Sequence, residues 1–334
     1  MKTLKKVSLI VMVLTVLIGI VIVTAPSKTH ISRSVMIKAP SKLIFQNLLI
    51  MKNFNSWSPW RKKDLNTKYE FFGPLMGVDS GMSWESEDAQ VGNGEMRIKE
   101  VIYPTTVTYL IKFGSSQATA SMILNESEIG TEVTWTYDEV EISGFNKFFA
   151  LLTETFIGPD YEEGLFNLKN MMEKAPVSTS DMEIMLSTSR SYIGTKDTLA
   201  ASMDMISAKL AKSYGDILSY ADRNRIEQEG PPIMFTLKAG EVFEFIAGIP
   251  MKANSVDSES LMLRATPEGY ELRASYYGPY KAMEPTYTEM ESLIGFLNMV
   301  SASAPWEEYI TDPGLEPNPE YRLTYIHWPI KYRE

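Results

Sequence analysis

A short stretch near the end of the chain, Ala304–Pro313, combines residue types that suit recognition of a lipophilic cation. It reads Ala-Pro-Trp-Glu-Glu-Tyr-Ile-Thr-Asp-Pro, and its pattern predicts a strand. Aromatic ring faces attract positive charge, and a half-buried carboxylate adds a Coulomb attraction that strengthens as water is excluded. Because alternate residues of a strand share a face, we expect Glu307 and Tyr309 on one side. Trp306 and Glu308 then lie on the other. The alternative is an ordinary strand with a solvated Glu face.

The composition excludes several classes of site. The 334 residues are 44% hydrophobic and 22% charged, which is typical of a globular chain. A formal net charge of -10 argues against a nucleic-acid partner, because such proteins need a basic face. The chain has no Cys, and its two histidines, His30 and His327, lie far apart in the sequence. We therefore predict no metal site and no cofactor, and any catalysis would rest on carboxylates, tyrosines or lysines.

The amino-terminal residues have the pattern of a membrane anchor. Met1–Lys6 carries three lysines, and Ser8–Ala25 is a run of eighteen residues without a charge. As a helix this run would extend about 27 Å, close to the thickness of a bilayer's hydrocarbon core. Residues 1–28 are predicted to be an uncleaved single-pass membrane helix, with the amino terminus in the cytoplasm and the later domains outside. A cleaved signal peptide ending at Val23-Thr24-Ala25 is the alternative.

Residues 29–175 are predicted to form one α+β domain. A strand at Ile31–Lys38 and a helix at Ser41–Ile50 come first. A series of strands follows, with a hairpin turn at Val91-Gly-Asn-Gly94. Two helices are expected after the strands, at Phe145–Ile157 and Asp160–Lys174, with Pro159 opening the second.

This region resembles the START-like/SRPBCC superfamily, specifically its polyketide cyclase/dehydrase-like branch. The resemblance rests on loose motifs in the expected order: Ala39-Pro-Ser with Phe45, Trp57-Ser-Pro-Trp60, Gly73/Gly77/Gly81 with Trp84, Val91-Gly-Asn-Gly94, and Gly158-Pro-Asp-Tyr-Glu-Glu-Gly-Leu-Phe-Asn-Leu-Lys169. It implies a helix-grip fold, in which a curved sheet grips the last helix around an apolar cavity. Such families bind lipids, sterols or polyketides. Core packing is the alternative role for Trp57, Trp60, Trp84 and Trp135.

The rest of the chain repeats a pattern. Residues 176–182 have the composition of a linker, and residues 183–334 form the second predicted domain. Its order is strand-helix-strand-strand, twice. Tyr214 and Tyr287 belong to the apolar stripes of the two helices. The two copies would pair their strands into one sheet and leave a ligand cleft between the halves. Strands are expected at 182–192, 231–237, 241–250, 269–277, 306–310 and 321–329.

The second domain resembles the GyrI-like domain, the effector-binding module of AraC-type and MerR-type regulators. The matching residues are Ala247-Gly-Ile-Pro250, Gly278-Pro-Tyr280, Trp306-Glu-Glu-Tyr309, Asp312-Pro313 and Thr324-Tyr-Ile-His-Trp-Pro329. Where the family often has a His before Gly-Pro-Tyr, this chain has Tyr276. No helix-turn-helix motif is evident, so direct control of transcription is not expected.

The GyrI-like resemblance also implies a ligand site. It places Glu307 in the ligand cleft with Tyr309, and desolvation should raise the pKa of that carboxyl. Phe243 and Phe245 are predicted walls of the cleft. Further candidates are Trp306, Tyr280 and Tyr192, with core packing as the alternative for each aromatic.

Three functions are compatible with these patterns. The first is a membrane-tethered protein whose two modules bind apolar or cationic amphipathic small molecules, for sensing, sequestration or transfer. The second is a hydrolase of reactive lipophilic compounds, with Glu307 as general base, assisted by Glu308 or Tyr309. A single matched acid without an evident partner favours binding over catalysis. The third is a non-catalytic envelope interaction module whose pockets are filled by their own side chains.

Overall fold

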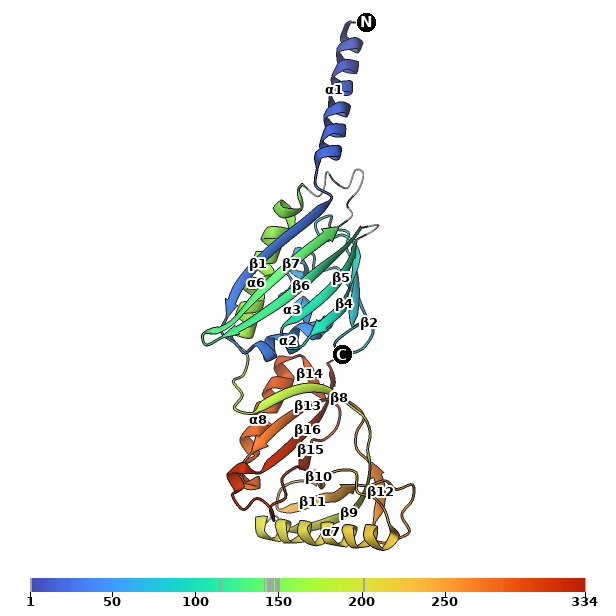
Figure 1. Cartoon of the computed structure of the whole chain (residues 1–334), viewed down its shortest axis with the longest axis vertical. Helices are drawn as coiled ribbons and strands as arrows, with labels where there is room; N and C mark the ends of the chain where they lie inside the picture. The colour runs from blue at the N-terminus through green and yellow to red at the C-terminus, as the bar shows by residue number, and fades with distance from the viewer. Residues whose placement is uncertain are drawn as a thin grey trace. The chain divides into compact units, whose positions relative to one another are not determined.

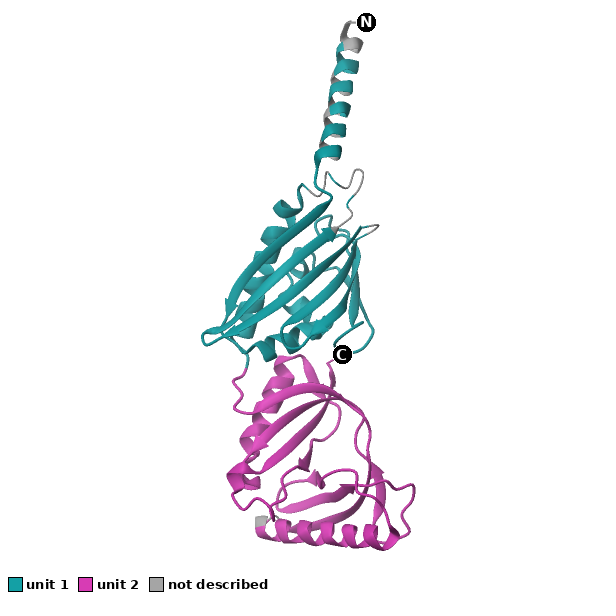
Figure 2. Ribbon diagram, in the orientation of Figure 1, with its two compact units in different colours: residues 1–175 teal, residues 176–334 magenta. Residues whose placement is uncertain are grey.

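The chain forms two separate compact units. The computed structural model describes residues 2–113, 116–140, 142, 147, 151–200 and 202–333. The units are residues 1–175 and 176–334 (Figure 2). Each contains one antiparallel sheet together with helices (Figure 1), so the predicted α+β class is confirmed. The boundary between the units lies at the start of the predicted linker, residues 176–182.

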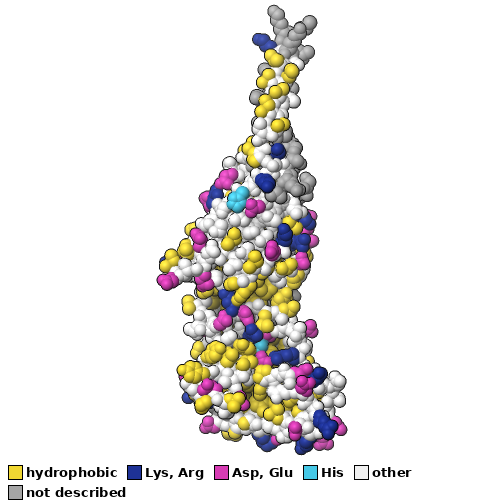
Figure 3. All heavy atoms as spheres, in the orientation of Figure 1, with side chains coloured by type: hydrophobic (Ala, Val, Ile, Leu, Met, Phe, Trp, Pro, Cys, Tyr) yellow, Lys and Arg dark blue, Asp and Glu magenta, His cyan; other side chains and the backbone are white. Residues whose placement is uncertain are grey.

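The predicted membrane anchor requires correction. Helix α1 (Lys2–Thr24) covers the lysine-rich segment and the apolar run, and its described apolar side chains are exposed (Figure 3). A helix needs about 20 consecutive apolar residues to cross a bilayer. The described residues do not include several side chains of α1. Within the described residues, no helix is both long and apolar enough to cross a membrane. This finding contradicts the predicted single-pass topology and the placement of the later domains outside the cell, and it gives no support to the predicted membrane partner.

Unit 1 is built on a seven-stranded sheet with the order β1-β7-β6-β5-β4-β3-β2. Strands β2 to β7 follow one another as a meander, whereas β1 comes first in the chain and pairs with β7. Alternation of side chains gives the sheet its buried face. In β6 the buried residues are Ala118, Ala120, Met122 and Leu124. The strands are β1 (Lys28–Ile37), β2 (Lys68–Phe72), β3 (Gly81–Glu85), β4 (Gly94–Ile102), β5 (Thr106–Phe113), β6 (Ser116–Ser127) and β7 (Gly130–Val140).

Four short helices connect β1 to β2. The first packs against β5 and β6, and its predicted apolar stripe, which includes Ile44 and Phe45, is buried. The hydroxyl of Tyr109 in β5 donates a hydrogen bond to the Leu48 carbonyl at 3.0 Å, which fixes this helix to the sheet. The helices are α2 (Ser41–Leu49), η1 (Met51–Asn53), α3 (Phe54–Trp57) and α4 (Trp60–Lys63).

A single long helix, α6 (Thr153–Met172), packs against β1 and β7. The predicted break at Pro159 is wrong, because the helix continues through this proline. Proline removes one helical hydrogen bond, but the apolar stripe that follows it is buried on the sheet and keeps the helix in place. Part of the other predicted helix, 145–157, lies outside the described residues. The buried stripe has spacings of three and four: Tyr161, Leu165, Leu168 and Met172.

Helix α6 packs tightly against the sheet at Gly164. Tyr161 stacks on Trp135 of β7 with ring centroids 3.8 Å apart and an interplanar angle of 13°. A Cβ atom on Gly164 would lie 2.7 Å from the Trp135 ring, closer than real Cβ contacts allow. The glycine therefore lets the helix pack against the tryptophan.

Unit 2 has nine strands in one sheet. Eight follow the order β12-β9-β11-β10-β15-β16-β13-β8, and β14 pairs with β16. The repeated pattern is visible as β9-α7-β10-β11 and β13-α8-β15-β16, and the two copies meet where β10 pairs with β15. The elements are β8 (Asp181–Ser187), β9 (Ser191–Ala200), α7 (Met203–Asn224), β10 (Ile233–Lys238), β11 (Val242–Pro250), β12 (Met262–Ala265), β13 (Gly269–Tyr277), η2 (Tyr280–Ala282), α8 (Glu284–Phe296), β14 (Met299–Ser301), β15 (Trp306–Tyr309), η3 (Pro319–Tyr321) and β16 (Leu323–Tyr332).

The two repeats of unit 2 exchange their leading strands, which are the strands that come directly before each repeat in the sequence. Strand β8 runs into β9 of the first repeat but pairs with β13 of the second. Strand β12 runs into β13 of the second repeat but pairs with β9 of the first. The single strand predicted over 182–192 is therefore two strands, interrupted at 188–190, because the chain leaves the edge strand β8 and enters β9, next to the opposite edge strand β12.

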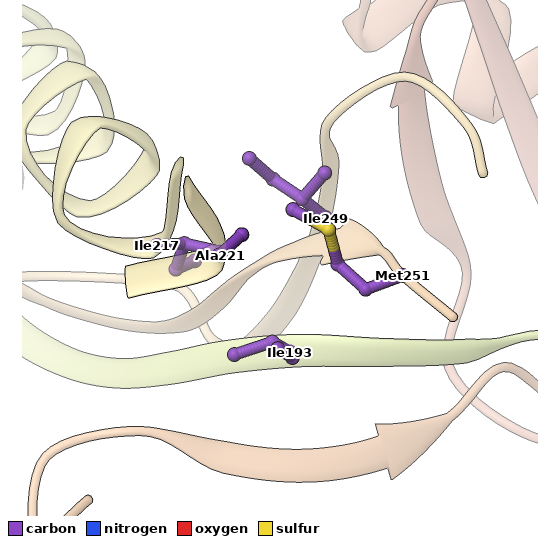
Figure 4. Close-up of a cluster of buried hydrophobic side chains, with 5 residues drawn as sticks. All are labelled: Ile193, Ile217, Ala221, Ile249 and Met251. Atoms are coloured by element: carbon purple, nitrogen blue, oxygen red, sulfur yellow. The ribbon is translucent and has the colours of Figure 1, made fainter. Parts of the chain in front are cut away.

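Helix α7 packs on β9 and β11 through a cluster of buried apolar side chains. Ile217 and Ala221, four residues apart, share one face of the helix. They meet Ile193, Ile249 and Met251 from the sheet and the segment after it (Figure 4). Helix α8 packs on β13 and β14.

Candidate ligand-binding sites

Glu307 lies on β15, one of the two central strands of the unit 2 sheet. It is opposite Met234 of β10 on one side and Ile326 of β16 on the other. Only 6% of its surface is exposed. The predicted alternative of a solvated Glu face therefore does not apply to Glu307.

Two tyrosine hydroxyls hold the Glu307 carboxylate. Tyr287 of α8 donates to Oε1 at 2.8 Å, and Tyr309 donates to Oε2 at 2.5 Å. Burial raises the pKa of Glu307, and the two hydrogen bonds oppose this rise without cancelling it. Among the described residues, no cationic side chain contributes to this shift. Glu307 is thus a buried acid with hydrogen-bond donors but without a positive partner.

Further tyrosines surround this carboxylate on the face covered by the helices. The ring of Tyr309 lies 5.2 Å from that of Tyr280 and 6.5 Å from that of Tyr214. All four tyrosines, Tyr287 included, are only partly exposed. Burial raises the pKa of Tyr214, Tyr287 and Tyr309, and the Glu307 charge adds to the rise. These phenols therefore stay protonated and act as donors.

Phe243 and Phe245 of β11 pack against each other, with centroids 5.5 Å apart. They belong to the apolar cluster that also contains Met234 and Tyr309. Phe245 is fully buried, so its role is structural, whereas Phe243 is partly exposed. Phe243 is therefore the better placed of the two to meet a ligand.

Trp306 and Tyr192 lie on the opposite face of the sheet from Glu307. Both belong to a cluster with Ile233. Phe235 stacks between them, at 5.4 Å from Tyr192 and 5.5 Å from Trp306. The structure does not bring these two predicted ligand contacts to Glu307.

Sequence reasoning missed Tyr287 and Tyr214 as members of the site. Both lie on apolar helical stripes, which predict core packing. The sequence signal that could have identified them as site residues is a tyrosine among aliphatic residues. A buried tyrosine hydroxyl requires a hydrogen-bond partner. Tyr287 finds Glu307, and Tyr214 donates to the Ile233 carbonyl at 3.0 Å.

Unit 1 contains an apolar cavity of about 190 Å³ between its sheet and α6. Met82, Met96 and Ile111 contribute from the strands, and Ile157 and Tyr161 from the helix. Rings make up much of the remaining wall: Phe54, Trp60, Tyr69, Trp84, Phe113, Trp135 and Phe156.

The tryptophans of unit 1 divide between core and cavity. Trp57, Trp84 and Trp135 are buried, which agrees with core packing, and Trp84 and Trp135 also line the cavity. Trp60 is partly exposed and lines it as well. Within the described ranges, no group of three or more His, Asp or Glu side chains is placed to hold a metal ion.

Comparisons with known proteins give distant likenesses. No family model matches the chain, and no curated protein matches it. The C-terminal domain of EcmrR is 12% identical, with 47% of this chain and 100% of that chain covered and a TM-score of 0.42. A hydrolase from Listeria innocua is 13% identical, with 50% of this chain and 98% of that chain covered and a TM-score of 0.36. The Aha1 dimer from Colwellia psychrerythraea is 19% identical, with 44% of this chain and 97% of that chain covered and a TM-score of 0.32. These likenesses assign no family or activity to the chain.

Proposed function

We propose that the chain is a binding protein with two modules for small lipophilic molecules. Unit 1 would be a START-like module, which is supported by a meander of strands packed on one long helix. Unit 2 would be a GyrI-like effector-binding module, which is supported by the duplicated strand-helix-strand-strand pattern. The observation that carries the proposal is the buried Glu307 carboxylate, held by two tyrosine hydroxyls.

Glu307 favours a ligand that carries a positive charge on an apolar body. A cation beside this carboxylate, in place of water, gains a Coulomb attraction that grows as the local dielectric falls. The rings of Tyr280 and Tyr309, 5.2 Å apart, would add attraction between cation and ring face. The cation would also lower the raised pKa of Glu307, so affinity should increase as pH rises and the carboxyl loses its proton.

The surroundings of Glu307 favour binding over catalysis. General acid–base catalysis works best with groups whose pKa lies near the working pH. The hydrogen-bond partners of Glu307 are Tyr287 and Tyr309, and burial raises the pKa of both phenols above the ordinary value of a tyrosine. They can position the carboxylate but are poor proton carriers at neutral pH.

The unit 1 cavity is suited to an uncharged apolar ligand. Its wall consists mainly of aromatic rings and methionines, with Asp160 as a charged member. The Asp160 carboxylate is already bound by Lys63, whose Nζ lies 2.6 Å from Oδ1. Aromatic walls without an unpaired charge gain most from excluding water around an apolar molecule.

Titration of the full chain with tetraphenylphosphonium tests the cation site. We expect saturable binding that strengthens between pH 5 and 8 and a loss of at least about tenfold in affinity in Glu307→Gln. Glu291→Gln is the matched control, since Glu291 is exposed on the same helix as Tyr287. Equal affinity of Glu307→Gln and wild type would remove Glu307 from the site.

Two further measurements complete the test. The first uses 2-naphthol, an uncharged fluorescent aromatic. Its binding should be lost in Ile111→Trp, which fills the unit 1 cavity, and kept in Ile102→Trp, since Ile102 is exposed.

The second measurement separates binding from hydrolysis. Recovery of intact tetraphenylphosphonium after long incubation with the chain is expected for a binding protein. Turnover of a lipophilic probe that depends on Glu307 would instead favour the hydrolase function.

A further inference from the structure

A cavity in unit 2 lies on the face of the sheet opposite Glu307. Its volume is about 240 Å³. Three buried ionisable residues from neighbouring strands line it, Glu308 of β15, His327 of β16 and Glu271 of β13. Arg190 and Arg273 complete the charged part of the lining. None of these residues contacts the Glu307 carboxylate, which faces α8.

The two carboxylates of this cavity already have cationic partners. Arg190 donates to Oε1 of Glu308 at 2.8 Å, and Nε2 of His327 lies 3.3 Å from Oε2 of the same residue. The other imidazole nitrogen, Nδ1, lies 2.7 Å from Oε1 of Glu271. Burial alone would lower the pKa of His327, but its hydrogen bond to Glu271 and its ion pair with Glu308 outweigh burial and raise it. A cationic ligand would therefore meet acids that are already neutralised.

The two arginines, in contrast, keep some donors that no described residue accepts from. A guanidinium carries five N–H groups. Arg190 uses one of them on Glu308, and Arg273 pairs with Glu183. Their side chains are 35% and 25% exposed, whereas those of Glu308 and Glu271 are 8% and 3% exposed. With His327 protonated, three positive charges line the cavity against two negative ones, while Glu183, outside the lining, pairs with Arg273.

The rest of the wall suits an apolar body. Met185, Leu186 and Pro267 line the cavity, and Trp306 adds an indole that stacks on His327 at 3.8 Å with an interplanar angle of 6°. This stacking holds both rings in fixed positions. The volume corresponds to about eight water molecules in the liquid, so the cavity admits a molecule the size of a small aromatic acid.

We propose that this cavity binds a small organic anion, with its carboxylate paired to Arg190 and Arg273 and its apolar body against Trp306 and Met185. Guanidinium groups pair with carboxylates through short, charge-assisted hydrogen bonds. The inference does not depend on Glu307. Unit 2 would then take ligands of opposite charge on its two faces.

Benzoate is the probe, and the ring resonances of the two histidines in the full chain are the readout. His327 contacts Glu308, which shares Arg190 with the bound anion, so benzoate should shift the His327 signals until they saturate. His30 lies in unit 1, and its signals should stay in place. Benzylammonium and benzyl alcohol have the same ring without the negative charge, and we expect at least about tenfold weaker effects on His327.

Two variants separate the proposed site from other binding. Arg190→Gln should weaken benzoate binding at least about tenfold, because it removes a charge-assisted contact. Met185→Trp keeps every charge and fills the cavity, because Met185 lines it opposite Glu271, so it should abolish the His327 shift. Glu291→Gln is the control and should leave the benzoate affinity unchanged, since Glu291 is exposed on α8. Three results would overturn the proposal: no saturable shift, equal binding of benzoate and benzylammonium, or benzoate binding that survives in both Arg190→Gln and Met185→Trp.

Discussion

Glu307 and Glu308 are neighbours in β15, yet the sheet places their carboxylates in opposite electrostatic surroundings. Glu307 meets two tyrosine hydroxyls on the helical face, and burial raises its pKa. Burial would also raise the pKa of Glu308, but the ion pair with His327 and the hydrogen bond from Arg190 outweigh it and lower the pKa. Consecutive residues of one strand thus differ in the direction of their shift, because their side chains point to different faces.

The raised pKa of Glu307 predicts a pH-dependent cost to folding. The folded chain holds the Glu307 proton more tightly than the unfolded chain, so stability falls as pH rises from about 4.5 through the folded pKa. Glu307→Gln removes this cost. We expect its melting temperature, relative to wild type, to be higher at pH 8 than at pH 4. Thermal unfolding at both pH values is the measurement, with Glu291→Gln as the control. A difference that does not change with pH would contradict the argument.

The network around His327 predicts a further loss of stability at higher pH. Because its pKa is raised above 6.5 in the folded chain, its stabilising contribution is present below that value and is lost as pH rises through the folded pKa. Titration of the ring by nuclear magnetic resonance should give a midpoint above 6.5. Glu271→Gln removes the Nδ1 partner and should lower the midpoint. A midpoint that stays unchanged in this variant would show that Glu271 does not set it.

Phe243 and Phe245 should respond differently to truncation. Phe245 is fully buried, and Phe245→Ala should reduce the free energy of unfolding by about 3–5 kcal/mol through lost burial and a cavity. Phe243 is partly exposed, so Phe243→Ala should cost less stability but weaken tetraphenylphosphonium binding. Chemical denaturation and ligand titration on the same samples separate the two effects. Equal losses of stability would contradict the assignment of Phe245 to the core.

Gly164 and Gly215 form a matched pair of helical glycines. A Cβ atom on Gly164 would clash with Trp135, so Gly164→Ala should destabilise the chain by about 1–3 kcal/mol. Nothing lies within 4 Å of a Cβ atom on Gly215 of α7, so Gly215→Ala should stabilise the chain by about 0.5–1 kcal/mol. Thermal unfolding compares the two. Stabilisation by Gly164→Ala would mean that α6 lies farther from the sheet.

Local patterns predicted most strands because alternation of apolar and polar residues reports which face is buried. The predicted bounds of β13 agree with the structure. The predicted break at Pro159 was wrong because proline counts against a helix locally, whereas packing on the sheet decides the outcome. The shared face of Glu307 and Tyr309 followed from the strand period alone.

The rest of the site depends on contacts between distant segments. Tyr287 reaches Glu307 only because α8 packs with that turn over β15, which spacing within either segment does not reveal. The cavity with Arg190, Glu271 and His327 depends on the pairing of β13 with β16 and of β15 with β16. No pattern in one segment encodes that register.

The exchange of leading strands has a consequence for how unit 2 acquires its structure. The strands β8 and β12 form the outer positions of the eight-strand path, and each is supplied by the repeat on the other side. Neither repeat can complete its own sheet, so a fragment holding one repeat would leave a strand edge open to association. The pairing of β8 with β13 also joins residues far apart in sequence and must form late. Unit 2 should therefore fold in one cooperative transition, with its two repeats gained or lost together.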